Sequence, residues 1–425
     1  MKEPSVAPFR AVRYDPKKVG GWARVVAPPY DVINEKMQKA RYERDPHNVV
    51  RLILGMHSPT DHEGDNRYTR AAQSLHEWLK QGILVEESKP AFYLYEQTFL
   101  LKGKGSCVRR GFLALKKLEE FQKGKVIPHE KTLSGPKADR LLLMKACRAN
   151  LSPVFALYAD PEKKLTAVLQ SYFNAQPDAD FVDEDGVRQR VWRVCDPELF
   201  TTANEVLSEK KLFIADGHHR YETALAFRDW IQSEDPAFNY ILMFFAETSD
   251  PGLLILPTHR VLHDWPSFDP QTFLKALEAD FNIQIISPRE EFLKKLAQEE
   301  GCRLAIGMLL KGNPHQYILI PKNDHDPRLG VDTQTLHEKI LKGVLHFSEE
   351  DQKNPQFLNF VKDRDEAMQM KDEGGGQAVF LLNPPLMEAL EKIVEKGKIL
   401  PPKTTYFYPK LLTGLVFYLM DPVAI

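Results

Sequence analysis

The sequence predicts a mixed α+β protein built on a mixed sheet. Short apolar runs of strand length alternate with segments whose apolar residues recur at helical spacing, along nearly all of the 425 residues. Hydrophobic residues make up 43% and charged residues 27%, as in ordinary folded domains. The length allows more than one domain. We expect an N-terminal core at residues 1–265 and a smaller α+β region at 266–425, because the chain changes character after Trp265.

The first region begins with extended segments and continues with alternating helices and strands. Apolar periodicity predicts helices at 34–44, 68–81, 141–149, 164–175 and 197–209. Apolar and β-branched runs predict strands at 8–13, 25–31, 49–54, 92–99, 110–115, 152–158, 181–185, 187–194, 240–245 and 253–256. The pairs 92–99 with 110–115 and 181–185 with 187–194 are expected to form hairpins. Residues 56–67 are polar and are predicted to form a loop.

The second region repeats the same alternation. Helices are expected at 270–279, 289–298, 333–345, 363–372 and 386–395, and strands at 281–286, 305–310, 315–320, 357–361 and 378–382. The run Gly374-Gly375-Gly376 lacks the lysine and hydroxyl residue of a nucleotide-binding P-loop. The aromatic stretch 403–410 either closes over a ligand or packs its tyrosines as a strand.

Composition excludes several classes of partner. The formal net charge of −2 gives no overall attraction to nucleic acid or membranes. The four cysteines are far apart and form no Cys-x-x-Cys pair, which fits a reducing compartment. The N-terminus lacks the apolar core of a signal peptide, and no apolar run reaches about 18 residues. We therefore expect a cytoplasmic protein without a membrane partner.

The clearest candidate for chemistry follows the apolar run 212–215. The sequence there is Asp216-Gly217-His218-His219-Arg220, and a helical pattern follows it. A strand, a glycine turn and a helix start leave backbone N–H groups exposed to an anion. Arginine grips two oxygens of one phosphate, and an aspartate can hold Mg²⁺ or accept a substrate proton. Alternatively, Asp216 only caps the helix, and the adjacent histidines point about 100° apart.

A second cluster lies in the most basic part of the chain. Residues 101–150 hold 13 Lys or Arg against 4 Asp or Glu, an excess of 9 positive charges. Within it, His129, Glu130, Lys137 and Arg140 gather at an expected loop-to-helix junction. Lysine and arginine suit phosphoryl oxygens, and glutamate suits a metal or a base. An ordinary charged loop is the alternative. Binding of nucleic acid is not expected, since no reading helix or RNA-binding motif accompanies the basic residues.

Two further pairs of candidate site residues are expected where strands end. Tyr30 and Asp31 follow Pro28-Pro29, which stops a strand, and His259 and Arg260 follow the strand at 253–256. Ligand sites collect at strand ends in α/β folds, so both pairs are candidates for substrate binding. A surface turn stiffened by proline is the alternative for the first pair.

The box Asp216-Gly-His-His-Arg220, continued by Tyr221-Glu-Thr-Ala-Leu225, resembles the phosphate-binding box of the ParB/sulfiredoxin-like superfamily. Free-serine kinases of that superfamily carry a very similar run. The whole chain also resembles a bacterial and archaeal family defined by a domain of unknown function, DUF1015. The stretches that carry this resemblance are 8–10, 27–31, 47–52, 128–130, 150–153, 257–260 and 401–410.

The superfamily resemblance implies a kinase of a small hydroxylated metabolite such as free L-serine, with ATP or ADP and Mg²⁺ as cofactors. It would have a ParB/sulfiredoxin-like core. Its phosphates would lie on Gly217, His218, His219 and Arg220, with support from Lys137 and Arg140. Asp216 would orient metal or nucleophile, and Asp31 or Glu130 would be the base. The chain is much longer than the compact kinases.

Two alternatives stay open from the sequence. The resemblance also allows a ParB-like nucleotide-binding regulatory module without small-molecule turnover, although no helix-turn-helix signature accompanies it. A metal-dependent hydrolase is the other alternative. It would draw on histidines and one glutamate without any established metal-ligand spacing: His129, Glu130, His218, His219 and His259.

Overall fold

The computed structural model describes residues 3–101, 104–121, 123–130, 132, 134–266, 268–322, 331–395, 399–401 and 403–421. The protein is a mixed α/β fold with two compact units. The first comprises 1–128, 132–253 and 409–425, and the second comprises 129–131 and 254–408. The chain therefore passes to the second unit at Leu254, before the expected boundary at 265/266, and its last residues belong to the first unit.

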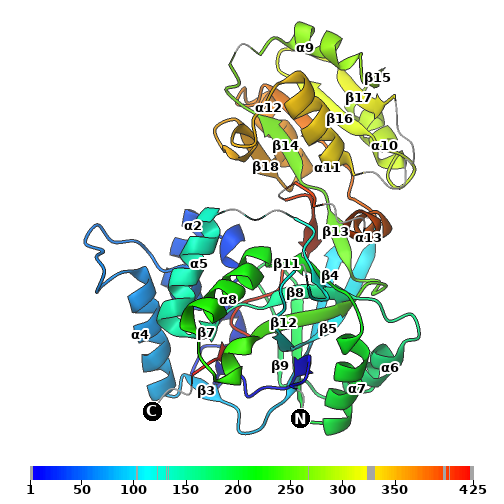
Figure 1. Ribbon diagram of the computed structural model, residues 1–425. Helices are drawn as coiled ribbons and strands as arrows, with labels where there is room; N and C mark the ends of the chain where they lie inside the picture. The colour runs from blue at the N-terminus through cyan, green and yellow to red at the C-terminus, as the bar shows by residue number, and fades with distance from the viewer. Residues whose placement is uncertain are drawn as a thin grey trace. The chain divides into compact units, whose positions relative to one another are not determined.

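The first unit is built on a nine-stranded mixed sheet in the order β6-β11-β8-β12-β5-β4-β10-β9, with β1 beside β5 (Figure 1). Neighbours β6–β11 and β8–β12 are parallel, and the other pairs are antiparallel. The strands are β1 (Val6–Ala7), β4 (Phe92–Leu101), β5 (Gly105–Lys117), β6 (Val126–Ile127), β8 (Val154–Tyr158), β9 (Ala179–Val182), β10 (Arg188–Val194), β11 (Leu212–Asp216) and β12 (Tyr240–Glu247). Both predicted hairpins are confirmed.

Helices and two small sheets complete the first unit. The helices are α1 (Trp22–Val25), η1 (Tyr30–Val32), α2 (Glu35–Arg44), α3 (Val50–Ile53), α4 (Arg67–Lys80), α5 (Ser134–Cys147), α6 (Lys164–Tyr172), α7 (Pro197–Ser208), α8 (His218–Ile231) and η2 (Pro236–Asn239). The small sheets pair β2 (Val12–Tyr14) with β3 (Leu84–Glu86) and β7 (Ala149–Asn150) with β21 (Tyr418–Leu419). Helix α5 packs against both α4 and α8 (Figure 1).

Two strand predictions are wrong, and the one at 8–13 holds only from Val12, where β2 begins. Residues 25–31 end helix α1 and enter the turn η1, and residues 49–54 contain helix α3. The side chain of Asn48 explains the second case, because its Oδ1 accepts from the Val50 N–H at 3.0 Å. Its Nδ2 donates to the Arg24 and Val26 carbonyls, which fixes the two segments together. An apolar run this short, buried on all sides, has no periodicity that separates strand from helix.

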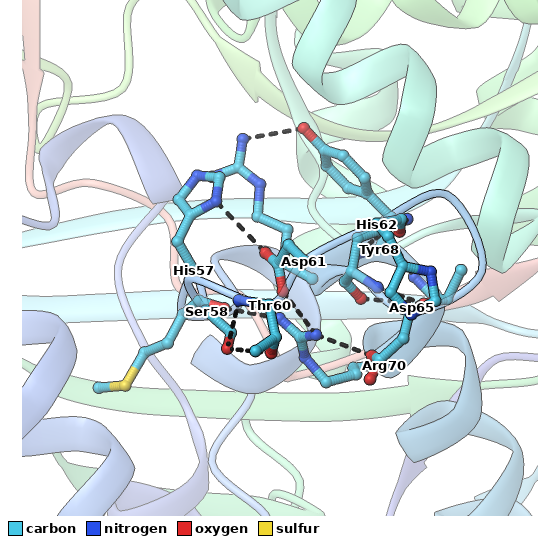
Figure 2. A network of polar contacts seen from close by, with 12 residues as sticks. His57, Ser58, Thr60, Asp61, His62, Asp65, Tyr68 and Arg70 are labelled. Carbon is cyan, nitrogen blue, oxygen red and sulfur yellow. Dashed lines mark hydrogen bonds and ion pairs between the residues drawn. The ribbon is translucent and has the colours of Figure 1, made fainter.

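The predicted polar loop before α4 is organised by one arginine. Figure 2 shows Arg70 between Asp61 and Asp65, and Nη1 lies 2.8 Å from a carboxylate oxygen of each. Its Nη2 also donates to the Met56 carbonyl at 3.0 Å. On the same helix, the Tyr68 hydroxyl donates to Asp139 of α5 at 2.7 Å. The loop and α4 thereby brace the helix that carries Lys137 and Arg140.

The second unit has a six-stranded antiparallel sheet in the order β15-β17-β16-β19-β14-β18. These strands are β14 (His259–Leu262), β15 (Phe281–Ile286), β16 (Ile306–Leu310), β17 (Gln316–Pro321), β18 (Leu358–Val361) and β19 (Ala378–Leu381). A separate pair joins β13 (Leu254–Leu256) to β20 (Tyr406–Tyr408). The helices are α9 (Pro270–Leu277), α10 (Arg289–Gln298), α11 (Asp332–Thr335), the π-helix η3 (Leu336–Val344), η4 (Asp351–Lys353), α12 (Arg364–Asp372) and α13 (Met387–Glu395). Among the described residues, no helix combines the length and apolar character needed to cross a membrane.

Candidate functional site

The central box has the predicted strand–turn–helix geometry. Strand β11 ends at Asp216, Gly217 has φ +91°, and α8 begins at His218. This left-handed backbone favours glycine. A Cβ on Gly217 would also lie 2.9 Å from Cζ of Arg220. The glycine therefore gives Arg220 room to fold back beside the start of its own helix.

Both carboxylate oxygens of Asp216 are held by cations. Arg220 donates to Oδ2, and Nζ of Lys410 lies 2.5 Å from Oδ1. Burial alone would raise the pKa of this carboxyl, but the charges of Lys410 and Arg220 outweigh burial and hold it well below its usual range. The backbone at Lys410 is anchored to the sheet, because its carbonyl accepts from Gln97 Nε2 at 3.1 Å.

Arg220 lines a small cavity of about 40 Å³ in the first unit, which we call the α8 cavity. Arg140 and Thr223 line it as well, together with Tyr30 and Ser152. Arg220 is 8% exposed and also donates to the Pro153 carbonyl, so its orientation is fixed from two sides. Thr223 is 1% exposed, and its hydroxyl has no hydrogen-bond partner among the described residues. A buried polar group of this kind calls for a water or a ligand oxygen.

Arg140 and Tyr30 form another wall of this cavity. The guanidinium carbon of Arg140 lies 4.0 Å from the ring centroid of Tyr30. Arg140 also donates to the Ile53 carbonyl at 2.6 Å and from Nε to Asp139 at 2.7 Å. Burial, and then the charge of Asp31, raise the pKa of Tyr30 to about 12. Tyr30 therefore remains a neutral hydroxyl at the pH of the cell.

A second polar group lies on the next turn of α8. Glu222 accepts from Nζ of Lys137 at 2.7 Å and from the Thr132 hydroxyl at 2.9 Å, which links α8 to the start of α5. Burial lowers the pKa of His219, although the charges of Asp31 and Glu222 act in the opposite direction. His219 is accordingly neutral near pH 7. Asp31 itself is exposed.

Four of the expected site residues belong to the second unit. His129 Nε2 lies 2.8 Å from the Thr405 hydroxyl, and Oε1 of Glu130 accepts from the Thr405 N–H at 3.1 Å. Oε2 of Glu130 accepts from the backbone N–H of Lys403 at 3.2 Å. The Glu130 carboxylate therefore holds the segment before β20.

His259 and Arg260 are also embedded in the second unit. They follow β13, as the sequence predicts, but they are also the first two residues of the next strand, β14. The Leu382 N–H donates to Nδ1 of His259 at 3.2 Å, and Arg260 is fully buried and donates to the Thr258 and Lys403 carbonyls. Contacts within the unit thus account for both side chains.

The box does not fit the expected magnesium ligand set. Mg²⁺ prefers carboxylate and phosphate oxygens in octahedral geometry, whereas both oxygens of Asp216 are paired with Arg220 and Lys410. Within the described part of the chain, no group of three or more His, Cys, Asp or Glu side chains could hold a metal ion. The residues suggested for a metal-dependent hydrolase are moreover divided between the two units.

Sequence reasoning missed three residues of this site. Lys410 lies 190 residues after Arg220, and only the return of residues 409–425 to the first unit brings it to Asp216. Glu222 and Thr223 follow the box on α8, and helical spacing could have indicated them. Glu222 is three residues after His219, and Thr223 is three residues after Arg220, so each pair shares a helix face.

Three solved structures resemble this chain at low sequence identity. A free serine kinase mutant in complex with ADP matches at 13% identity and a TM-score of 0.37, over 67% of this chain and 84% of that chain. A free serine kinase mutant in complex with AMP matches at 14% identity and a TM-score of 0.39, over 69% of this chain and 86% of that chain. A conserved hypothetical protein from Pyrococcus furiosus matches at 14% identity and a TM-score of 0.38, over 70% of this chain and 93% of that chain. At such low similarity these matches say nothing of the activity of this chain.

No curated protein matches the sequence. The family described as "Protein of unknown function (DUF1015)" matches residues 6–343, which is more than half of the 425-residue chain and contains the whole Asp216–Arg220 box. This chain therefore belongs to the DUF1015 family.

Proposed function

We propose that this protein binds a phosphoryl group at the start of α8 and transfers it between ATP or ADP and a small hydroxylated metabolite such as free L-serine. The start of the helix supplies backbone N–H groups and the positive end of the helix dipole. Arg220 and Arg140 supply fixed guanidinium groups beside it. This arrangement suits the negative charge that phosphoryl transfer spreads over equatorial oxygens.

The cavity behind the box is the observation that carries the proposal. Its volume of about 40 Å³ corresponds to roughly three or four water positions at about 10–15 Å³ each. That is the space of one phosphoryl group and is too small for a whole nucleotide. Arg140, Arg220 and the unpartnered Thr223 hydroxyl would donate hydrogen bonds to the oxygens of the phosphoryl group. The base and ribose of a nucleotide would lie outside the cavity.

Asp31 is the base that we propose for the acceptor hydroxyl. Its carboxylate is exposed, and its charge acts on both Tyr30 and His219. Neutral His219 can donate a hydrogen bond to the substrate hydroxyl or accept one from it. Lys137, held by Glu222, places a further cation on the same side of α8. Arg140, Arg220 and Lys137 thus offset phosphate charge without a metal ligand from Asp216.

Purified protein incubated with ATP or ADP and a panel of small alcohols tests the proposal. We expect phosphorylated product, with L-serine converted to phosphoserine, detected by mass spectrometry. Asp31→Asn should lower turnover roughly 10²–10⁴-fold, as expected for loss of a general base, while nucleotide affinity stays the same. Asp61→Asn, on the loop of Figure 2, is the matched control for loss of one carboxylate. Absence of turnover with every combination of nucleotide and alcohol would contradict the proposal.

The pairing of Asp216 also favours a second candidate, a nucleotide-binding regulatory module without small-molecule turnover. With both oxygens on Lys410 and Arg220, Asp216 is held as a structural carboxylate rather than as a reactive one. Titration calorimetry with ATP, ADP and AMP separates the two candidates. Nucleotide binding without any product supports the module, and a salt-dependent gel shift with duplex DNA would place it with ParB-like switches.

A further inference from the structure

A larger cavity lies at the other end of the main sheet of the first unit. Asp216 pairs with Phe155 near the start of β8, whereas this cavity adjoins Tyr158 and Glu247, which pair where the parallel strands β8 and β12 end. Its volume is about 410 Å³, within the usual range for small-molecule sites. We call it the α6 pocket, defined by Arg110, Tyr158, Lys163, Leu169, Phe173 and Glu247.

The charged groups of the α6 pocket are balanced. Nζ of Lys163 lies 2.8 Å from Oε2 of Glu247 and also donates to the Ser249 hydroxyl at 2.6 Å. Arg110 donates from Nε to Glu96 at 2.7 Å. Arg110 shares Glu96 with Arg190, and Lys163 faces Glu247. Asp250 also lines the pocket, where its Oδ2 accepts from the Arg110 N–H at 3.2 Å.

The helix start beside this pocket argues against a phosphate or another anion bound by backbone N–H groups. The start of α6 is occupied by protein, because Asp160 accepts from the backbone N–H groups of Lys164 at 3.1 Å and Thr166 at 2.9 Å. The anion chemistry available at α8 is therefore not available here.

The remaining wall is apolar and aromatic. Leu169 of α6 and Phe173, which directly follows that helix, line the pocket, and both are buried. The guanidinium carbon of Arg110 lies 5.0 Å from the ring centroid of Phe173, so a cation and an aromatic face meet in one wall. A ligand for this pocket needs an apolar body beside one positive and one negative group.

We propose that the α6 pocket binds a small zwitterion with an apolar side chain, that is, a free hydrophobic amino acid. The ligand carboxylate would lie against Lys163 and Arg110, its ammonium against Glu247, and its side chain against Leu169 and Phe173. The volume of about 410 Å³ lies within the range of small-molecule sites and accommodates a molecule the size of phenylalanine. This site is separate from the α8 cavity and does not depend on the proposed transfer reaction.

The backbone of Lys163 is consistent with a binding role. Lys163 has φ +55°, a left-handed conformation in which glycine is favoured over residues with a Cβ. This chain has a lysine at a position where glycine would fit with less strain. Strained residues of this kind gather at binding sites, where the position of the side chain matters.

Titration calorimetry with L-phenylalanine and L-leucine tests the proposal on the full chain. Two analogues each remove one charge from phenylalanine: 3-phenylpropionate lacks the ammonium, and phenethylamine lacks the carboxylate. We expect at least one of the two amino acids to bind with 1:1 stoichiometry. We expect the corresponding single-charge analogues to bind at least tenfold more weakly. Failure of both amino acids to bind, or equal binding of an analogue, would overturn the proposal.

The variant Lys163→Gly removes the ammonium and relieves the backbone strain, but it also leaves Glu247 without its cation, so thermal denaturation is measured beside binding. We expect at least tenfold weaker amino-acid binding by a protein that still unfolds in one cooperative transition. Gln232→Gly is the matched control, because Gln232 also has positive φ (+48°) and does not line the pocket. It relieves a similar backbone strain and should leave binding unchanged. Undiminished binding to Lys163→Gly would overturn the assignment.

Discussion

At the residue scale, removing the hydroxyl of Thr223 should weaken ATP binding without lowering the stability of the fold. It is buried, lines the α8 cavity and has no partner among the described residues. Thr223→Val keeps the shape and removes the unsatisfied group. We expect the free energy of unfolding to stay the same or to rise by roughly 1 kcal/mol, while binding of ATP weakens about tenfold. Urea denaturation and titration calorimetry measure the two effects.

The matched control is Thr404→Val. That hydroxyl is equally buried but donates to the Pro401 carbonyl at 2.7 Å. Its loss should lower the free energy of unfolding by roughly 1 kcal/mol and leave ATP binding unchanged. If Thr223→Val loses as much stability as the control and binds ATP normally, the hydroxyl has a structural partner and the cavity is not a phosphoryl site.

The buried imidazole of His259 makes stability depend on pH. Burial, and then the charge of Arg260, lower the pKa of His259 to about 4. The unfolded side chain takes up a proton below about pH 6.5, but the folded one does not until about pH 4. The contribution of the neutral His259 ring to the free energy of unfolding is therefore fully present above pH 6.5 and is lost as the pH falls toward 4. The hydrogen bond from the Leu382 N–H to Nδ1 requires the neutral ring, because a protonated Nδ1 cannot accept it.

His259→Asn keeps an acceptor near Nδ1 and cannot titrate. Between pH 7.5 and 5.0 we expect the wild type to lose roughly 2 kcal/mol more than this variant. Denaturation of both proteins at the two pH values measures the difference. The same pH slope in both proteins would show that His259 is not the titrating group. His337, whose pKa is lowered to about 3 by burial and then by Arg260, remains in both.

At the scale of elements, the turn between β11 and α8 determines where Arg220 lies. Gly217 and Gly186 both have left-handed backbones, with φ of +91° and +76°. A Cβ on Gly186 meets nothing within 4 Å, whereas one on Gly217 would lie 2.9 Å from Cζ of Arg220. Gly186→Ala should therefore cost only the conformational strain, roughly 1–2 kcal/mol.

Gly217→Ala should cost more than Gly186→Ala, because it also displaces Arg220 from the Pro153 carbonyl and Asp216. We expect weaker ATP binding in Gly217→Ala alone. Thermal denaturation of both variants and calorimetry with ATP provide the comparison. Equal destabilisation together with intact binding in both variants would mean that Arg220 does not need this glycine.

The predicted helix pattern succeeded for α4, α6, α7 and α8 because their apolar residues line one face at regular spacing. The pattern failed at 25–31 and 49–54. Val50, Leu52 and Ile53 are all buried, so their run carries no polar–apolar alternation from which to read a period. The side-chain cap from Asn48 determines the helix, and its partners Arg24 and Val26 are over 20 residues earlier in the chain.

At the scale of the whole molecule, the last residues complete the first unit. Phe417 is fully buried, and its backbone exchanges hydrogen bonds with Val12 at 2.8 and 3.0 Å. Phe417→Ala should destabilise the first unit by roughly 3–5 kcal/mol. Phe380→Ala, in the core of the second unit, should destabilise that unit by a similar amount.

Hydrogen exchange read by peptide distinguishes these two variants. Phe417→Ala should speed exchange in β4, β5 and β12, and Phe380→Ala should speed exchange in β14, β16 and β19. Each variant is the control for the other, since both remove a fully buried ring. Faster exchange throughout both units in either variant would show that the two units unfold together.

The sequence by itself determined the fold class, most regular elements, the Asp216–Arg220 box at a strand-to-helix turn, and membership of the DUF1015 family. These features depend on local spacing and on contiguous motifs. The tertiary structure alone decided that Lys410 pairs with Asp216, that Thr223 faces a cavity with Arg140 and Arg220, and that Glu130 and Arg260 are held within another unit. Such contacts join residues tens to hundreds of positions apart, and nothing in local periodicity encodes which distant side chains will meet.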